Sequence, residues 1–294
     1  MRTLILSLAL WPFGLAAQDD YAQPPQRMWA VQDVSGTYGS IIQDEAFYSL
    51  GEWRAMLPGS RLLQGDVPPM NAWSYGYGAY AYPLFTVSAG LNLDGQRRPL
   101  SRYDRQLRVS LSYAPENEMN SSWERRRTGV FDTLVGQHTG QVFVIDTTWY
   151  ERYSAFFYYS RLEVDASMLW RRRTATRWGW YTGAGISLGM IIGEDCYVDY
   201  RTGVRSSGYS FNPPLVDQVR ARDSEMLRAP NGFSGAMRAV IGAEFRLGAS
   251  HRFWSRLHLH YELQPILQYT QFAGTNLRSD MAWRSQLGIR ALLR

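Results

Sequence analysis

The sequence predicts an all-β protein: an antiparallel up-and-down transmembrane β-barrel of ten strands, or alternatively eight, with a mostly irregular N-terminal segment that contains one short helix. Three observations predict this fold. Apolar and polar residues alternate in long runs, and these runs reach the length of about 9–11 residues that a tilted membrane strand needs. Many of their apolar faces also begin or end in an aromatic ring, as is typical of the girdles at the two membrane surfaces. A soluble all-β protein is the alternative, because it also alternates.

The first 17 residues have the features of a signal peptide. Arg2 supplies a positive charge, residues 3–15 form an apolar stretch, and Ala16 and Ala17 suit cleavage before Gln18. After this segment, no run approaches the roughly 20 apolar residues that a membrane helix needs. An exported chain of this kind is periplasmic, secreted or an outer-membrane barrel, and the alternation favours the outer membrane.

Residues 18–75 differ from the rest and are expected to form a periplasmic or plug segment. They are rich in proline and have few alternating runs. Ile42, Phe47, Leu50, Trp53 and Leu57 recur near helical spacing, which predicts one short amphipathic helix. Such a helix can lie on the membrane surface, plug the barrel or cap it, and a capping helix is the preferred interpretation.

Residues 76–294 are expected to form the barrel, and residues 253–263 illustrate the pattern. Leu257, Leu259 and Tyr261 fall on one face of a strand, whereas His258 and His260 fall on the other. Successive side chains of a strand point to opposite faces, so one face meets lipid and the other the lumen. Similar alternation is found at 85–93, 107–113, 158–170, 180–192, 237–247 and 283–293.

The connections suggest an orientation and a strand number. The links at 171–177 and 248–252 are short and are expected to be periplasmic turns, whereas the insertion at about 194–232 and the link at 270–280 are expected to point outward. About nine segments follow residue 84, but closed bacterial barrels have even strand numbers. Either one more strand lies between residues 28 and 82, or the weak candidate at 141–149 is not in the wall.

The C-terminal half resembles a known type of protein. The runs GAGISLGMIIGE (183–194), GFSGAMRAVIGAEFRL (232–247) and RLHLHYELQP (256–265) resemble small outer-membrane β-barrel proteins of the Bacteroidota kind. The resemblance covers about the last 140 residues and hardly touches the first 80. It rests on strand patterns, so it implies a fold and a location but no activity.

Composition narrows the classes of function. All 31 basic residues are arginine and none is lysine, which reflects either genomic base composition or a need for ion pairs and contacts to phosphate-bearing headgroups. The arginines are spread along the chain without a recognition motif, so nucleic acid is not an expected partner. Cys196 is the single cysteine, which excludes an intramolecular disulfide. No motif predicts a cofactor.

The polar faces would bring many charges together inside a narrow barrel, where they must pair. The preferred interpretation is an ion-pair network that holds the wall together. Its predicted members are Arg108, Arg161, Glu163, Asp165, Arg238, Glu244, Arg246, Arg256, Glu262, Arg284 and Arg290.

His258, His260 and Glu262 share one face of a strand at a spacing of two residues. They are weak candidates for a metal site or an acid–base pair, because both ligand types suit such sites. No serine–histidine or aspartate–histidine set is predicted near the outer rim, so no catalytic residue is assigned.

Three functions remain open. The preferred hypothesis is a non-enzymatic structural or interaction component of the outer membrane. It would contact membrane lipid, and a protein partner through the 194–232 insertion or the N-terminal segment, because function usually resides on loops held by a rigid scaffold. A small channel or transporter is the first alternative, and a barrel enzyme acting on lipid or peptide is the second.

Overall fold

The computed structural model describes residues 30–44, 48–73, 79–93, 103–135, 140, 142–172, 176–208, 216–248, 251 and 253–293. The predicted signal peptide lies outside these residues. Strands dominate the described part of the chain. In chain order the elements are β1 (Val31–Asp44), α1 (Leu50–Met56), α2 (Arg61–Gln64), β2 (Asn71–Trp73), β3 (Ala79–Asn92), β4 (Tyr103–Val135), β5 (Val142–Arg172), β6 (Trp178–Gly208), β7 (Val216–Arg228), β8 (Gly232–Arg246), the 3-10 helix η1 (Trp254–Arg256), β9 (Leu257–Phe272) and β10 (Arg278–Leu292).

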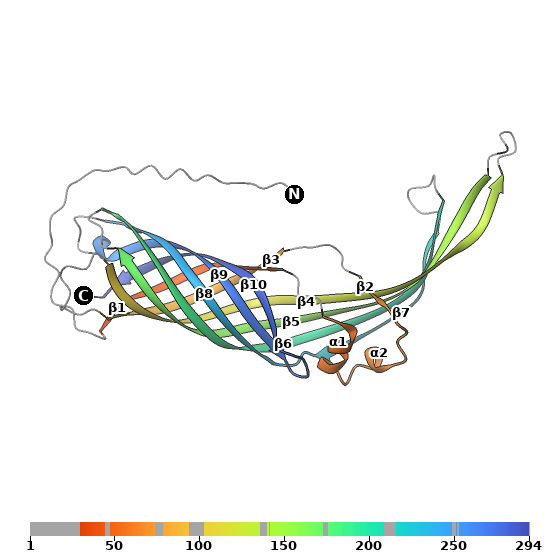
Figure 1. The fold of residues 1–294 in the computed structure, drawn as a ribbon, viewed down its shortest axis with the longest axis horizontal. Helices are drawn as coiled ribbons and strands as arrows, with labels where there is room; N and C mark the ends of the chain where they lie inside the picture. Colours follow the sequence, from red (N-terminus) through yellow and green to blue (C-terminus); the bar gives the residue numbers. More distant parts are fainter. Residues whose placement is uncertain are drawn as a thin grey trace.

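Eight of these strands close an antiparallel ring (Figure 1). Their order is β4-β3-β1-β10-β9-β8-β6-β5, and β5 pairs back with β4. Outside the ring, β2 pairs with β4 and β7 pairs with β6, so the whole sheet has ten strands. The predicted antiparallel barrel is confirmed, with ten strands in the sheet and eight in the closed wall.

The first strand of the wall is β1, which pairs with β10 on one side and with β3 on the other. β1 is the additional strand that was expected between residues 28 and 82, because closed barrels have an even number of strands. The expected start of the barrel at residue 76 was therefore wrong. The sequence pattern missed this strand because Gly36 and Ser40 interrupt its outward face, on which Tyr38 is 59% exposed.

Three wall strands are much longer than a membrane span. β4, β5 and β6 have 33, 31 and 31 residues, whereas a tilted span needs about 9–11. Their far parts leave the ring and extend beyond one end of the barrel together with β2 and β7 (Figure 1). We call this part the projecting sheet: residues 117–135, 142–159 and 196–208, with β2 and β7.

The expected outer loop at 194–232 is therefore mostly strand. β6 continues to Gly208 and the chain returns as β7, with Tyr197 opposite Met226. The weak candidate at 141–149 belongs to β5 but lies in the projecting sheet rather than in the wall. The ends of β5 and β8 that lead to the two short links lie at the opposite end of the barrel, as expected (Figure 1).

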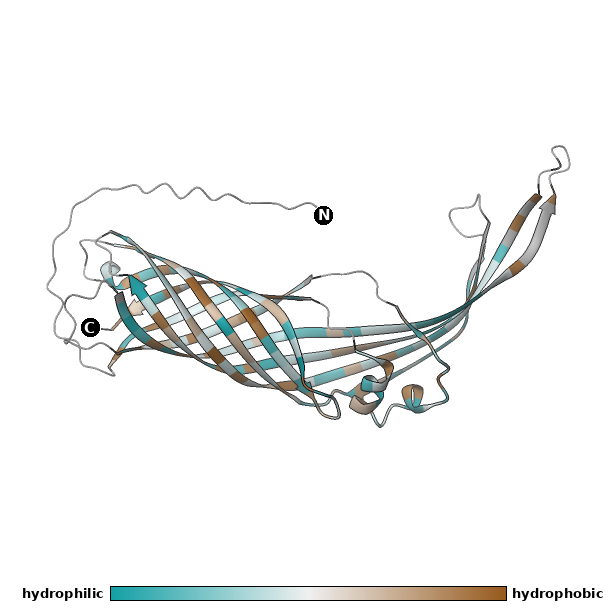
Figure 2. Ribbon diagram, in the orientation of Figure 1, coloured by the Kyte–Doolittle hydropathy of each residue, from teal (hydrophilic) through white to brown (hydrophobic). Residues whose placement is uncertain are grey.

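Side chains alternate between lumen and exterior along the wall strands. On β5, Glu163 and Asp165 are 2% and 1% exposed, whereas the intervening Val164 is 56% exposed. On β6, Ile186 and Leu188 are also more than half exposed. Figure 2 shows the resulting alternation of hydrophobic and hydrophilic residues along the barrel. An apolar exterior around a polar interior is the arrangement that lipid requires.

Among the described residues, no helix is long and apolar enough to span a membrane.

The two helices lie at the mouth of the barrel against the projecting sheet. α1 begins with a capping box, in which the Ser49 hydroxyl accepts from the Glu52 amide while the Glu52 carboxylate accepts from the Ser49 amide at 2.8 Å. The single predicted helix therefore exists but is shorter than its pattern, because Ile42 lies in β1; Phe47 lies outside the described residues. The second helix was not predicted.

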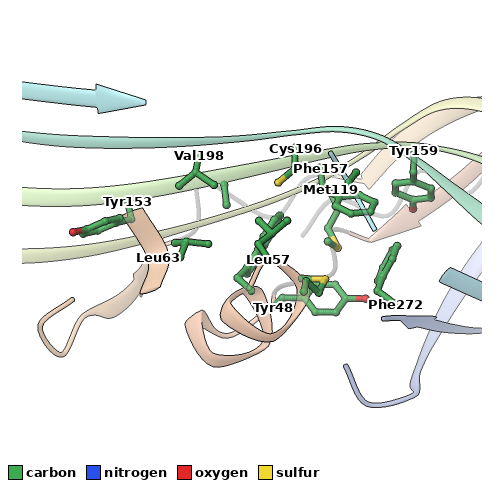
Figure 3. Packing of buried hydrophobic residues seen from close by; sticks show 14 of the residues in the cluster. Tyr48, Leu57, Leu63, Met119, Tyr153, Phe157, Tyr159, Cys196, Val198 and Phe272 are labelled. Carbon is green, nitrogen blue, oxygen red and sulfur yellow. The ribbon is translucent and has the colours of Figure 1, made fainter. Parts of the chain in front are cut away.

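Both helices cover an apolar cluster on one face of the projecting sheet, which we call the inner face (Figure 3). Trp53 is fully buried there, and its ring centroid lies 6.2 Å from that of Trp123 and 6.5 Å from that of Phe157. Arg61 of α2 pairs with Asp223 of β7 at 2.8 Å. The helical segment thus lies neither at the end of the barrel with the short links nor in the lumen, since it lies against the projecting sheet.

Candidate functional site

The lumen contains three groups of paired charges, and the first centres on Glu262 of β9. Arg108 donates two hydrogen bonds to its carboxylate from the opposite wall, one of 2.9 Å to Oε2. The Tyr181 hydroxyl donates at 2.5 Å and the Gln264 amide at 2.7 Å. Glu262 is 0% exposed and Arg108 is 6% exposed. A buried carboxylate is tolerated when it is paired in this way.

The second group centres on Glu163 and Asp165 of β5. Arg238 of β8 donates to Asp165 at 2.5 Å. Arg284 of β10 pairs with Glu163, and its Nη1 lies 3.7 Å from Asp165. The Nε of Arg161 lies 3.3 Å from Glu163. Because these residues come from three different strands, the pairs connect β5 with β8 and β10 through the lumen.

The third group lies toward the end of the barrel with the short turns. Glu244 of β8 accepts from Arg171 at 2.7 Å and pairs with Arg290 of β10 at 2.8 Å. Arg290 also lies 3.6 Å from Asp33 of β1. Gln106 of β4 completes the group, because its amide donates to Asp33 at 2.6 Å and its carbonyl accepts from Arg171 at 2.7 Å.

Nine of the eleven predicted network residues are in these three groups. The other two are not seen in an ion pair within the described part of the chain. Arg246 lies at the end of β8, where its side chain is only partly buried. Arg256 lies in the 3-10 helix η1 and not on a lumenal strand face, because β9 begins at Leu257.

Besides the amides Gln106 and Gln264, sequence reasoning missed three members of the groups. Asp33 was missed because β1 was not recognised, and Arg171 because it was assigned to a turn. Tyr181 lies on β6, where odd-numbered residues face the lumen, so the alternation could have revealed it. A Cβ atom on Gly242 would lie 2.3 Å from the Tyr181 ring, so this glycine leaves the space that the ring fills.

The three candidate metal ligands do lie on the lumenal side. Among the described residues, no group of three or more histidine, cysteine, aspartate or glutamate side chains is arranged to hold an ion. The carboxylate of Glu262 is occupied by Arg108, and the Nε2 atom of His260 remains 4.0 Å from it. The Nδ1 atom of His258 lies 3.5 Å from Arg290. The metal site stays a prediction, and in this structure arginines contact two of its three candidate ligands, Glu262 and His258.

One sequence motif of hydrolases also occurs in the lumen. Residues 185–189 read Gly-Ile-Ser-Leu-Gly, which is the spacing of a nucleophile elbow. An elbow requires a sharp turn between a strand and a helix, whereas these residues lie in the middle of β6. Ser187 is 2% exposed and faces the packed lumen. The motif is a by-product of glycines alternating along a strand.

The projecting sheet ends in an exposed apolar ribbon made by β4 and β5. Val135 pairs with Val142, and both are about 60% exposed, at 60% and 61%. Val130 and Val144 are 66% and 40% exposed on the same ribbon. Apolar side chains grouped at the far end of a projecting element are typical of a contact surface.

Comparisons with known proteins give only remote likenesses. No protein-family model matches the chain, and no curated protein does. A solved structure of Ail, the attachment invasion locus protein of Yersinia pestis, is 10% identical over 89% of this chain and 99% of its own, with a TM-score of 0.25. Ail was also crystallised in complex with the heparin analogue sucrose octasulfate. OprB of Pseudomonas putida is 6% identical over 89% of this chain and 94% of its own, with a TM-score of 0.13. A relationship to Bacteroidota proteins stays a prediction.

Proposed function

We propose that this chain is a non-enzymatic interaction protein of the outer membrane, in which a closed barrel anchors a sheet that contacts a protein partner outside the cell. The observation that carries the proposal is the continuity of β4, β5 and β6, which run unbroken from the wall into the projecting sheet. A contact made on the sheet would therefore be held rigidly by the barrel.

The lumen favours an anchor over a channel. Its charged side chains pair across the barrel, and Arg284 and Glu163 are 1% and 2% exposed. A conducting pore would need a continuous water path between such groups. His258 lies 3.5 Å from Arg290, and Glu262, which lies 4.0 Å from His260, is paired with Arg108, which disfavours the enzyme alternative.

The valine ribbon and the helical segment support a partner outside the membrane. The ribbon offers exposed apolar side chains at the far end of the sheet. The helices cover the inner face and leave the opposite face open. The proposal keeps the expectation that residues 194–232 point outward.

Thiol labelling on intact cells tests the orientation. Burial raises the pKa of the Cys196 thiol to about 12, so the native cysteine should give no background. A membrane-impermeant maleimide should label Thr128→Cys on the projecting sheet but not Thr176→Cys at the opposite end. Both positions are exposed, so each serves as the control for the other. The reverse pattern would place the sheet in the periplasm and refute the proposal.

Native mass spectrometry after gentle extraction tests the partner. The full chain should carry a second protein, and a variant in which a short turn replaces residues 129–147 should lose it while keeping its heat-dependent gel mobility. A bare monomer in both cases would remove the interaction hypothesis. Discrete current steps in a planar bilayer would favour the channel instead.

A further inference from the structure

The face of the projecting sheet opposite the helices continues the lipid-facing surface of the barrel. We call it the outer face. On β5, even-numbered residues such as Val164 point outward in the barrel, and Tyr158, which is 39% exposed, and Arg152 have the same parity, although Ser160 between Val164 and Tyr158 is buried. The odd-numbered Phe157 and Tyr153 are buried under the helices. The outer face is thus the part of the sheet that stands directly above membrane lipid.

Arginines gather on this face in one row across neighbouring strands. Arg152 of β5 is opposite Arg201 of β6, and Arg201 is opposite Arg222 of β7. Arg126 of β4 is close by, since it and Arg152 share the carboxylate of Glu124. The side chains of Arg126, Arg201 and Arg222 are 55%, 44% and 54% exposed.

Two carboxylates lie beneath the arginines and orient them. Arg152 approaches Glu124 at 2.7 Å, and Arg222 approaches Asp199 at 2.9 Å, while Arg201 also pairs with Asp199. Both carboxylates are only 4% exposed. Burial alone would raise the pKa of Glu124, but hydrogen bonds from its two arginines outweigh burial and lower it. Glu124 therefore remains charged, and the guanidinium groups are fixed by their ion pairs with part of each fork facing outward.

This arrangement is costly for a sheet that needs only to be stable. Like charges directly opposite on neighbouring strands are destabilising, and this row has three arginines in succession. Arg201 and Arg222 share the single carboxylate of Asp199, which leaves an excess positive charge at that point of the row. Fixed guanidinium forks bind phosphate in a bidentate manner. The excess charge therefore indicates an anionic ligand.

The height of the row above the lipid selects the kind of ligand. Below the arginines lies an apolar row in which Phe156 is opposite Tyr197 and Tyr197 is opposite Met226, which is 68% exposed. At about 3.3 Å per residue, Arg152 is roughly 20 Å along the strand from Tyr158, or about 15 Å higher for a tilt near 40°. A phospholipid headgroup layer is only about 6 Å thick, so its phosphate would not reach the row. A larger saccharide headgroup would.

We propose that the outer face of the projecting sheet binds the phosphorylated saccharide headgroup of a glycolipid in the outer leaflet. Arg126, Arg152, Arg201 and Arg222 pair with phosphate groups, and the apolar row below them rests on the lipid surface. The inference rests on the proposed function in one respect, namely that the projecting sheet lies outside the cell. It assigns one face of the sheet to lipid and leaves the valine ribbon and the helices to a protein partner.

The test compares two variants of the full chain in nanodiscs. The patch variant combines Asp199→Asn, Arg201→Gln and Arg222→Gln, so that no buried carboxylate is left unpaired. The control variant is Arg61→Gln, which changes net charge by the same amount on the inner face, where its side chain is 70% exposed. The probes are purified lipopolysaccharide, the same material after enzymatic dephosphorylation, and a lipid-free phosphorylated polysaccharide.

The dissociation constant for lipopolysaccharide should rise by about tenfold or more in the patch variant and change by less than about twofold in the control variant. Dephosphorylation should weaken binding to the unaltered chain by a similar factor. Equal affinity of the patch and control variants would overturn the proposal. Equally tight binding of the lipid-free polysaccharide would also overturn it, because the ligand would then be a soluble polymer.

Two further measurements keep the result interpretable. Arg126→Gln leaves Arg152 on Glu124, and it replaces the patch variant if that variant does not form a heat-modifiable barrel. Labelling of Thr128→Cys from outside the cell is repeated in each background. Loss of that labelling would refute the proposed function, whereas intact labelling with unchanged lipopolysaccharide affinity refutes only the glycolipid inference.

Discussion

Replacing Glu262 with glutamine should be one of the most destabilising changes in the barrel. The substitution keeps the shape of the side chain but removes the charge that faces Arg108, which is 6% exposed. Breaking a buried pair by neutralising one partner costs about 3–5 kcal/mol, because the other charge stays buried without compensation. Gln264 and the Tyr181 hydroxyl also lose an ionic acceptor, so we expect the upper part of this range.

Urea unfolding in micelles measures this effect, with the folded fraction read from heat-dependent gel mobility. With a slope of about 2 kcal/mol per M, a loss of about 4 kcal/mol lowers the midpoint by about 2 M. The matched control is Asp223→Asn, which breaks the exposed pair with Arg61 and should cost less than about 1 kcal/mol. Combining Glu262→Leu with Arg108→Met should recover most of the loss, since it removes both charges.

The result that would refute this reasoning is a Glu262→Gln midpoint within error of the Asp223→Asn midpoint. A small loss would mean that water reaches Arg108 and solvates it. The lumen would then be hydrated and not filled by its own ion pairs, and the channel hypothesis would regain support.

Three other perturbations test separate parts of the structure. Cys196 should not react with a maleimide at pH 7.5 in the folded protein but should react fully in denaturant, because burial raises the pKa of its thiol to about 12. Rapid labelling of the folded chain would show that the inner-face cluster opens. Gly242→Ala should lower the unfolding free energy by about 1–3 kcal/mol, since its Cβ would lie 2.3 Å from the Tyr181 ring; an unchanged urea midpoint would contradict this packing. Trp53→Ala should weaken the packing of α1 on the inner face by about 3–5 kcal/mol. Hydrogen exchange should then be faster in α1 and unchanged in the wall strands. If exchange in α1 is also unchanged, Trp53 does not hold this helix in place.

The barrel could be predicted from the sequence because its strands alternate with a strict period of two. Lipid outside and charge inside give a clear signal where outward positions are apolar and inward positions are polar, as along residues 161–168. β1 gave no such signal, because Gly36 and Ser40 occupy outward positions that an apolar residue would otherwise mark. Nine members of the lumenal network followed from the same parity rule, but which arginine meets which carboxylate depends on the ring order of the strands.

The projecting sheet could not be predicted, for a physical reason. Where the wall passes into the projecting sheet, bulges interrupt the pairing between residues 114 and 117 of β4 and between 193 and 196 of β6. A bulge shifts the inward and outward positions of one strand relative to its neighbour. Alternation read along the chain therefore loses its phase there, and a continuous strand looks like a strand followed by an irregular insertion.

The ring is sealed where the first described strand meets the last, since β1 pairs with β10 from Asp33↔Leu292 to Gln43↔Ala282. Contacts between such distant segments form slowly, because a long chain must be closed before they are made. β4, β5, β6 and β7 instead follow one another as hairpins, which form quickly. The order of assembly follows: the projecting sheet can be complete while the barrel is still an open, curved sheet. Until β10 pairs with β1 and β9, the edges of these two strands are open to any other strand. Pairing of β10 therefore also removes the edges through which this chain could aggregate.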